Sequence, residues 1–193
     1  MGDKSAQKKQ LILKTARRIF MEKGYKNVTM KDVVEACGIS RGGLYLYFNS
    51  VEEIFLEVMC AEEEEADDVF SRELKGNATA VDVLMIFLKE QKREILRRKE
   101  DLSVAVYEYY FANDLTEEEN PLRGRFEAAA KALSRLITAG IANGEFYDVD
   151  VAAAADNIMF VLEGLRICAR TMGVTEEMAD NELLTLVSGL VAE

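Results

Sequence analysis

Apolar residues recur every three or four positions along almost the entire chain, which is the spacing of amphipathic α-helices. Residues that cap helices stand ahead of most of these apolar segments, and glycine follows several of them. No stretch alternates apolar and polar residues over the length of a β-strand, and no sequence repeat is visible. The pattern therefore predicts an all-α protein with about nine helices.

Start and stop signals give the expected helix ranges. Thr29 with Asp32, and Ser50 with Glu53, have the three-residue spacing of helix caps, and Ser40, Asp150 and Thr175 are expected to cap the third, eighth and ninth helices. The first helix is expected to end at Gly24. In the fifth helix, at 79–98, the side chains of Val83, Ile86, Phe87 and Ile95 are expected to face inward. The acidic run 62–65 is expected to be a solvated face, and 113–121 a loop. Later helices are expected at 29–37, from residue 40, and at 51–74, 79–98, 102–111, 122–143, 150–172 and 175–191.

Residues 28–48, VTMKDVVEACGISRGGLYLYF, form two short helical segments hinged on Gly38. Glycine tolerates the positive φ that such a tight turn requires. This is the layout of a helix-turn-helix, whose second helix enters the DNA major groove. We expect Val33, Val34, Cys37, Ile39 and Leu44 to fix the helix crossing, and Arg41, Gly42, Gly43, Tyr45 and Tyr47 to face outward.

The outward residues suggest how DNA would be contacted. Arg41 can pair with a guanine edge or a phosphate, and tyrosine hydroxyls can donate to phosphate oxygens. The adjacent glycines permit a close approach to the helix backbone, although each lowers helix propensity by roughly 1 kcal/mol. Lys4, Lys8 and Lys9 are placed to follow the flanking backbone. The predicted DNA-binding residues are Thr29, Lys31, Ser40, Arg41, Gly42, Gly43, Tyr45, Tyr47 and Asn49.

The charge distribution agrees with such a partner. The net charge is −11, but residues 1–50 carry ten basic and four acidic residues, a net charge of +6, and the remainder carries −17. A basic head can neutralise phosphates while an acidic body limits indiscriminate binding. The apolar and charged fractions, 49% and 31%, are those of a folded protein.

Several site classes are disfavoured by composition. The chain has no histidine and three distant cysteines, which argues against zinc, haem and Ser-His chemistry. We expect no enzyme activity, metal or cofactor. No apolar run is long enough to span a bilayer, and the basic N-terminus lacks the apolar core of a signal peptide. The expectation is a cytoplasmic protein with reduced thiols and no membrane partner.

The eighth predicted helix is apolar on two sides, and the ninth, with Leu183, Leu184, Leu186, Val187, Leu190 and Val191, is similarly broad. A helix that is apolar nearly all round is buried nearly all round. The eighth helix is therefore either a central helix of a monomer or part of a dimer interface. We favour the dimer interface, because two-fold DNA sites normally require two copies. One side carries Val151, Ala155, Ile158, Met159, Leu162, Leu165 and Ala169, and the other Ala153, Phe160, Val161, Gly164, Ile167 and Cys168.

The segment from about residue 10 to residue 59 resembles the DNA-binding domain of TetR-type transcriptional repressors. The resemblance rests on ARRIFMEKGY (16–25), on residues 28–48 and on the capped fourth helix. It implies a nine-helix homodimer with an N-terminal DNA-binding domain at 1–50, linked by the helix 51–74 to a ligand-binding and dimerisation domain within 51–193. It also implies release of DNA by a small-molecule effector. The broad apolar faces of the helices at 150–172 and 175–191 predict the dimer contacts, and two copies predict a palindromic operator.

Two positions depart from the family pattern. Members commonly have threonine or serine where this chain has Gly43, and lysine where it has Val51. Both family residues usually contact phosphate. Asn49, Ser50 or the N-terminal lysines are candidates to compensate for their loss.

Three readings of the body remain open: an effector-binding domain, an architectural or protein-interaction factor with a solid core, and, least favoured, an enzyme using Tyr107, Glu108 and Arg166. Aromatics and methionine can form an adaptable cavity. Glu163 and Arg166 can anchor a charged ligand or pair with each other. For any single candidate, a core role is favoured over ligand contact. The candidates are Phe87, Gln91, Tyr107, Tyr110, Phe111, Phe126, Met159, Phe160, Glu163 and Arg166.

Overall fold

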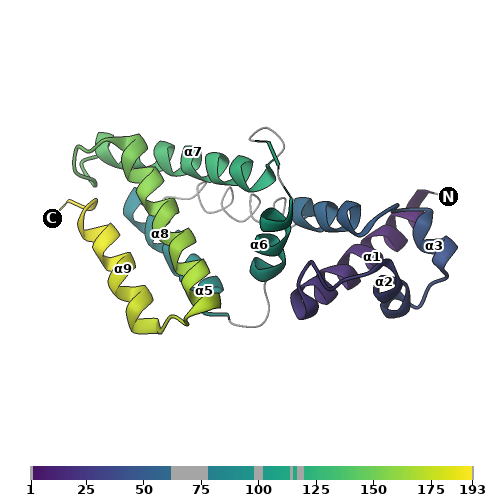
Figure 1. Cartoon of the computed structure of the whole chain (residues 1–193). Helices are drawn as coiled ribbons and strands as arrows, with labels where there is room; N and C mark the ends of the chain where they lie inside the picture. The colour runs from purple at the N-terminus through teal and green to yellow at the C-terminus, as the bar shows by residue number, and fades with distance from the viewer. Residues whose placement is uncertain (1, 62–77, 98–101, 114, 117–119, 193) are drawn as a thin grey trace. The chain divides into compact units, whose positions relative to one another are not determined.

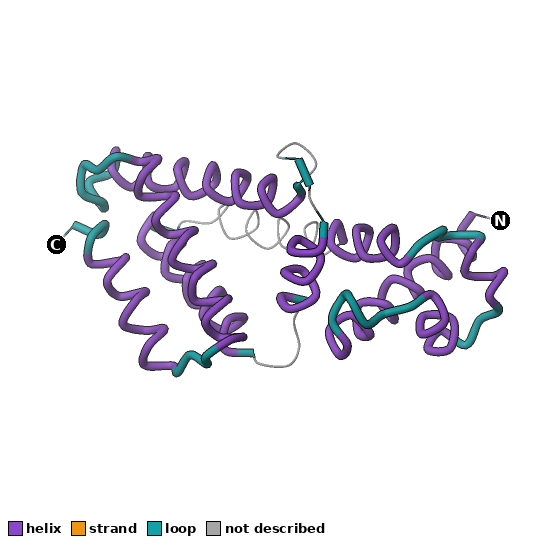
Figure 2. The backbone as a smooth tube through the Cα atoms, viewed as in Figure 1, coloured by secondary structure: helices purple, strands orange, loops and turns teal. Residues whose placement is uncertain are grey.

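The computed structural model is all-α, as the apolar spacing predicted (Figures 1 and 2). It describes residues 2–61, 78–97, 102–113, 115–116 and 120–192. These residues contain no β-strand, only an isolated bridge between Phe146 and Val191. The predicted end of the fourth helix near Leu74 and the acidic run 62–65 lie outside the described residues.

The chain forms two compact units, each with its own core. The first comprises Met1–Asp67 and Lys99–Asp114, and the second Asp68–Arg98 and Leu115–Glu193. The first unit therefore holds α1 (Gly2–Lys23), α2 (Met30–Cys37), α3 (Arg41–Tyr45), the helical residues 51–61 and α6 (Ser103–Ala112). Contacts thus group residues 51–61 and α6 with the predicted DNA-binding segment, whereas the sequence reading divided the chain after residue 50.

The core of the first unit consists of the residues that carry the helical periodicity. Ile12, Ala16 and Phe20 of α1 are fully buried, as are Leu44 and other apolar side chains of the following helices. The Phe20 and Phe55 rings meet edge to face with their centroids 4.9 Å apart. The core therefore joins α1 to the residues on both sides of α3, which holds α3 in a fixed position within this unit.

Tyr109 carries α6 into the same core. Its ring lies 5.0 Å from that of Tyr25 and 5.3 Å from that of Phe55, and its hydroxyl donates to a Glu52 oxygen at 3.1 Å. Burial, together with the Glu52 carboxylate, raises the pKa of Tyr109 to about 12. Glu108 also accepts the backbone N–H of Lys26 at 3.0 Å. These contacts fasten α6 to α1 and to the turn that follows it.

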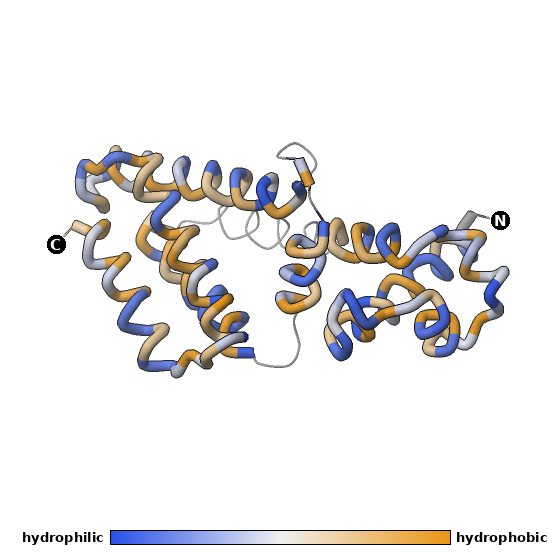
Figure 3. Tube along the Cα trace, in the orientation of Figure 1, coloured by the Kyte–Doolittle hydropathy of each residue, from blue (hydrophilic) through white to orange (hydrophobic). Residues whose placement is uncertain are grey.

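The second unit contains α5 (Ala80–Leu96), α7 (Pro121–Ala142), α8 (Val151–Thr171) and α9 (Glu176–Ser188), with α5 packed against the other three. Figure 3 shows hydrophobic positions recurring along these helices. As predicted, Asp150 caps α8 and Thr175 caps α9. The expected inner side of α8 is buried at Ala155, Ile158, Met159, Leu162 and Leu165.

Two expectations for this unit need correction. Ile86, predicted to face inward, is 45% exposed, because the buried positions Leu84 and Leu88 fix the helix phase and Ile86 lies on the opposite side. The ninth helix ends at Ser188 rather than near residue 191, because the chain then pairs with the α7–α8 turn: Tyr147 donates to Leu190 at 2.9 Å. None of the helices in the described part of the chain has the length and hydropathy needed to cross a membrane.

Candidate nucleic-acid interface

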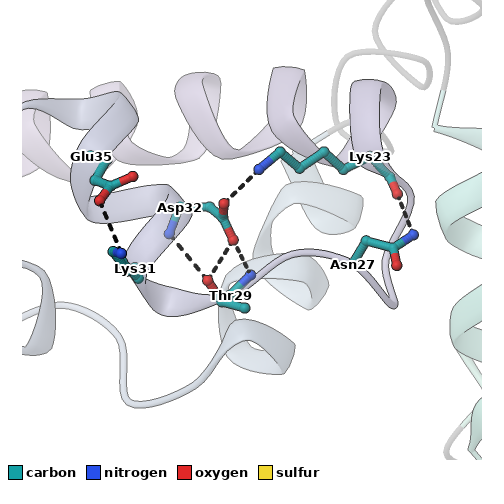
Figure 4. Close-up of polar contacts among 6 residues, drawn as sticks. All are labelled: Lys23, Asn27, Thr29, Lys31, Asp32 and Glu35. Atoms are coloured by element: carbon teal, nitrogen blue, oxygen red, sulfur yellow. Dashed lines mark hydrogen bonds and ion pairs between the residues drawn. The ribbon is translucent and has the colours of Figure 1, made fainter.

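Helix α2 begins with a reciprocal cap (Figure 4). Thr29 accepts the backbone N–H of Asp32 at 3.2 Å, and Asp32 accepts the backbone N–H of Thr29 at 2.8 Å. The Thr29 hydroxyl also donates to Asp32, and the Lys23 ammonium lies 2.5 Å from the same carboxylate. Lys23 first, and then Thr29, hold the pKa of Asp32 far below its ordinary value.

This cap bears on the predicted phosphate contacts. Both bonding functions of the Thr29 hydroxyl are directed to Asp32, so the hydroxyl is engaged within the protein. The Lys31 ammonium is 3.6 Å from Glu35, and the Lys31 side chain is 82% exposed. A surface pair of this kind is weak. Lys31 is therefore the more available of the two groups for a phosphate.

The turn and the start of α3 follow the sequence prediction. Gly38 has φ +63°, the left-handed conformation for which glycine is suited. Ser40 caps α3 by accepting the backbone N–H of Gly43 at 3.1 Å. Leu44 and Phe48 are fully buried and fix the rotation of α3 about its axis.

This rotation sorts the predicted DNA contacts into three rows. Successive residues of a helix are separated by about 100°, so residues four apart share a row. Arg41 and Tyr45 form one row, with the guanidinium 5.6 Å from the ring centroid. Gly42 and Leu46 form the row opposite Leu44, which we call the outer ridge of α3. Gly43 and Tyr47 form the third row, which lies toward α1.

The exposure of two residues near the outer ridge differs from the sequence prediction. Gly43, expected to face outward, is buried: a Cβ there would lie 3.1 Å from the Ser40 hydroxyl oxygen and 3.8 Å from the Lys8 ammonium nitrogen. Leu46, absent from the predicted contacts, is 82% exposed. Counting 100° steps from the buried Leu44 would have identified Leu46, which falls nearly opposite Leu44 together with Gly42. The burial of Gly43 follows instead from its neighbours Ser40 and Lys8. Tyr47 is half-buried, and its hydroxyl accepts from Ser5 at 3.3 Å.

Neighbouring lysines of α1 differ in availability. Lys9 pairs with Glu57 at 2.6 Å and lies 5.5 Å from the Phe48 ring centroid. Among the described residues, by contrast, no carboxylate pairs with Lys8. Asn49, another predicted contact, is engaged through its backbone and side-chain N–H groups, which both donate to Glu53. Of these two lysines, Lys8 is therefore the one whose charge no carboxylate of the described residues neutralises.

Comparison with known proteins identifies the family of the chain. Residues 12–58 match the model described as bacterial regulatory proteins of the tetR family, and residues 83–179 match the tetracyclin repressor-like C-terminal domain. The chain belongs to the TetR family. Members of this family are DNA-binding transcriptional regulators, usually repressors, and the predicted helix-turn-helix is confirmed as part of the family's N-terminal domain.

The similarity to known proteins covers nearly all of this chain. The HTH-type transcriptional regulator YfiR of Bacillus subtilis (strain 168) is 34% identical over 93% of this chain and 84% of its own length. QacR of Staphylococcus aureus (strain Mu50) is 24% identical over 88% of this chain and 90% of its own. A transcriptional regulator from Saccharomonospora viridis, solved in complex with choline, shares the fold with a TM-score of 0.84 at 21% identity, covering 97% and 100% of the two chains.

Within this TetR-family regulator, three predicted ligand residues of the second unit meet. Arg166 donates to Glu163 at 3.0 Å and also to Gln91, and the side chains of Arg166 and Glu163 are 27% and 26% exposed. The ion pair offered as an alternative to a ligand contact is thus present. No group of metal-ligating side chains was found among the described residues.

The aromatic candidates and Met159 are divided between the two units. Met159 is buried in the core of the second unit, and Phe87 packs against that core. Phe126 and Phe160 have ring centroids 5.0 Å apart, but Phe160 is 67% exposed. Three others, namely Tyr107, Tyr110 and the 81%-exposed Phe111, belong to α6 in the first unit.

Part of the second apolar side of α8 is exposed to solvent, whereas Val161 and Cys168 of that side pack against the core. Phe160 and Ile167 are 67% and 40% exposed, and Gly164 lies between them on the same side. We call Phe160, Gly164 and Ile167 the outer stripe of α8. On α9, which packs against α8, Leu184 is 60% exposed. Exposed apolar side chains grouped in this way are typical of surfaces that bind another protein.

Proposed function

We propose that this chain is a homodimeric repressor that binds a palindromic operator through α3 and leaves it when a small-molecule effector binds. The observation that carries the DNA part is the exposed surface of α3, where Arg41, Tyr45 and the outer ridge lie beside Lys8, which pairs with no carboxylate among the described residues. An exposed helix with basic neighbours suits docking in a major groove lined by phosphates.

The outer stripe of α8 supports two copies. Phe160 and Ile167 are exposed to water in the single chain, and burying their apolar surface in an interface would be favourable. A second copy supplies an identical stripe, and a two-fold axis makes such a surface self-complementary. Two copies also present two α3 helices, which explains why the expected operator is palindromic.

An effector would have to bind the free and DNA-bound conformations with different affinities. We propose that its polar group binds at Gln91, Glu163 and Arg166, where a carboxylate and a guanidinium lie together in a partly buried setting. The choline held by the regulator of the same fold supports a small charged molecule as the effector class. Glu163 suits a cationic group and Arg166 an anionic one.

The DNA part is tested with the full chain. Selection from random duplexes at low salt should recover palindromic sites, and a reporter carrying the selected site should be expressed less when the protein is produced. A purified dimer that enriches no palindrome would overturn operator binding. Increased reporter expression would instead make the protein an activator.

The effector part needs separate probes. Choline and decanoate, a cationic and an anionic probe, should be titrated against the operator complex and followed by fluorescence anisotropy. We expect one of the two charge classes to release DNA, with Glu163→Gln removing a response to choline or Arg166→Gln removing a response to decanoate. Release that persists unchanged in both variants would place the effector elsewhere.

A further inference from the structure

The outer ridge of α3 has no hydrogen-bonding side chain. It consists of Gly42, where a Cβ would meet nothing within 4 Å, and Leu46, which is 82% exposed. A single exposed leucine on a protein surface is ordinary. This one differs by position, because it lies opposite the fully buried Leu44 on the helix that carries the DNA-binding surface.

Helix geometry brings these two residues to the same partner. Leu46 has helical backbone angles, φ −71° and ψ −18°, so the 100° rule extends from Gly42 to Leu46. Gly42 leaves the first turn of the ridge without a side chain, so an approaching surface reaches the helix backbone there. Leu46 is then the side chain that projects farthest along this row, one turn later.

The major groove offers few apolar groups to such a side chain. Its base edges present hydrogen-bond donors and acceptors, with one exception: the C5-methyl group of thymine. A leucine pressed against a polar base edge would desolvate that edge without compensating it. A leucine pressed against a thymine methyl removes apolar surface of both from water.

We propose that Leu46 contacts a thymine methyl group, and that Gly42 allows the helix to approach closely enough for this contact. Each half-site of the operator then carries a thymine at one fixed position. Leu46 is thus a specificity-determining residue, whereas the neighbouring Arg41 and Lys8 supply charge. The inference rests on the proposed operator binding.

Replacing thymine by uracil tests the contact, because it removes only the methyl group. The duplex selected by the full chain is resynthesised with deoxyuridine at each thymine in turn, symmetrically in both half-sites. At one position we expect wild-type affinity to fall about threefold to fourfold per half-site, the value of burying one methyl group. Leu46→Ala should bind the thymine and uracil duplexes at that position equally, while Leu46→Met should retain the preference.

Leu11→Ala is the matched control, because Leu11 is also an exposed leucine of the first unit, at 54%, but lies on α1. It should retain the wild-type uracil penalty. Equal melting temperatures for the variants and the wild type exclude unfolding as the cause. A uracil penalty that is the same in Leu46→Ala and wild type, or a wild-type protein insensitive to uracil at every position, overturns the inference. Failure to select any duplex overturns operator binding itself, and the inference with it.

Discussion

Two helices of this protein carry the same small motif and present it in different surroundings. The outer ridge of α3 pairs Gly42 with Leu46, and the outer stripe of α8 pairs Phe160 with Gly164, in each case four residues apart and exposed. In both, a glycine lets a partner reach the helix backbone beside a large apolar side chain. The motif by itself therefore does not distinguish a DNA-binding helix from a protein-binding one.

The neighbours of the two motifs make the distinction. On α3 the flanking row holds Arg41 and Tyr45, and Lys8, which pairs with no carboxylate of the described residues, lies nearby. Leu46 is therefore an exposed aliphatic group beside a guanidinium, an ammonium and a phenol. On α8 the stripe continues to Ile167, and the Phe160 ring lies 5.0 Å from that of Phe126. A single exposed apolar side chain suits a partner that offers single methyl groups, whereas a broader apolar surface suits another protein.

The largest expected effect comes from placing a charge in the α8 stripe. Phe160→Glu should convert the dimer to a monomer, because two carboxylates would face each other across a two-fold axis. Operator affinity should then fall on the order of 10²-fold or more, because the second half-site no longer binds intramolecularly. Light scattering after size-exclusion chromatography and anisotropy measure the two effects.

Met85→Glu is the control for that substitution. Met85 is 44% exposed on α5 of the same unit but lies outside the stripe. It should leave both the mass and the affinity unchanged. A Phe160→Glu protein that remained dimeric would remove the basis for assigning the stripe to a second copy.

Gly42→Ala and Gly164→Ala separate the two motifs. A Cβ at either position meets nothing within 4 Å, so each variant should raise the free energy of unfolding by up to about 1 kcal/mol through helix propensity. Gly42→Ala should nevertheless weaken operator binding about tenfold, a loss of ~1.4 kcal/mol, with the dimer intact. Gly164→Ala should instead weaken the dimer.

Urea denaturation, sedimentation and anisotropy together resolve these outcomes. The decisive result is a Gly42→Ala protein that is more stable and binds DNA less tightly. Unchanged operator affinity in this variant would mean that DNA does not approach the outer ridge of α3 closely.

A smaller effect is expected from the charge beside α3. Lys8→Gln should lower operator affinity roughly fivefold per half-site at 0.15 M salt. It should reduce the slope of log affinity against log salt by about 0.9 per subunit, or about 1.8 for the dimer, which is the loss of one phosphate contact in each half-site. Lys131→Gln, which removes the same charge from an exposed site on α7, should change neither. Equal slopes for Lys8→Gln and wild type would show that Lys8 does not contact phosphate.

The smallest effect concerns α2, which packs against α3. The pKa of Asp32 is depressed in the folded protein, so the unfolded state binds its proton at higher pH. The stabilisation is therefore complete at neutral pH and is lost as pH falls through and below the ordinary carboxyl range. Asp32→Asn should lower the free energy of unfolding by at most about 1 kcal/mol at pH 7, a difference that shrinks toward pH 3.

Urea titrations monitored by circular dichroism at pH 7, 5 and 3 give this difference. Glu22→Gln, on the exposed surface of α1, is the control and should produce no such trend. A wild-type advantage that persists undiminished at pH 3 would contradict the depressed pKa.

Local signals in the sequence predicted much of the fold. Thr29, Asp150 and Thr175 are N-caps as expected, and Gly38 adopts the turn conformation that its type favours. Such features depend on residues close together in the chain, so sequence alone reveals them. Predicting the outer ridge also requires knowing which side of α3 is buried, and that side is set by Leu44 and Phe48.

Long-range contacts explain what the sequence did not predict. Nothing near α6 indicates that Glu108 accepts the backbone N–H of Lys26 or that Tyr109 joins a core formed some fifty and more residues earlier. The ion pair of Glu163 with Arg166 was predictable as a local option, but the bond from Arg166 to Gln91 links residues 75 positions apart. Such contacts follow from how the helices pack together.

The place of Tyr109 has a consequence for building hybrid regulators. A graft that transfers residues 1–50 onto another body would leave Tyr109 behind, and with it a ring that closes the core around Phe55. The residues of the other body that replace 51–61 and α6 would then have to pack against residues 1–50 of this protein. A transplantable head for this protein is therefore discontinuous in sequence, and a library that exchanges heads should vary α6 together with the first sixty residues.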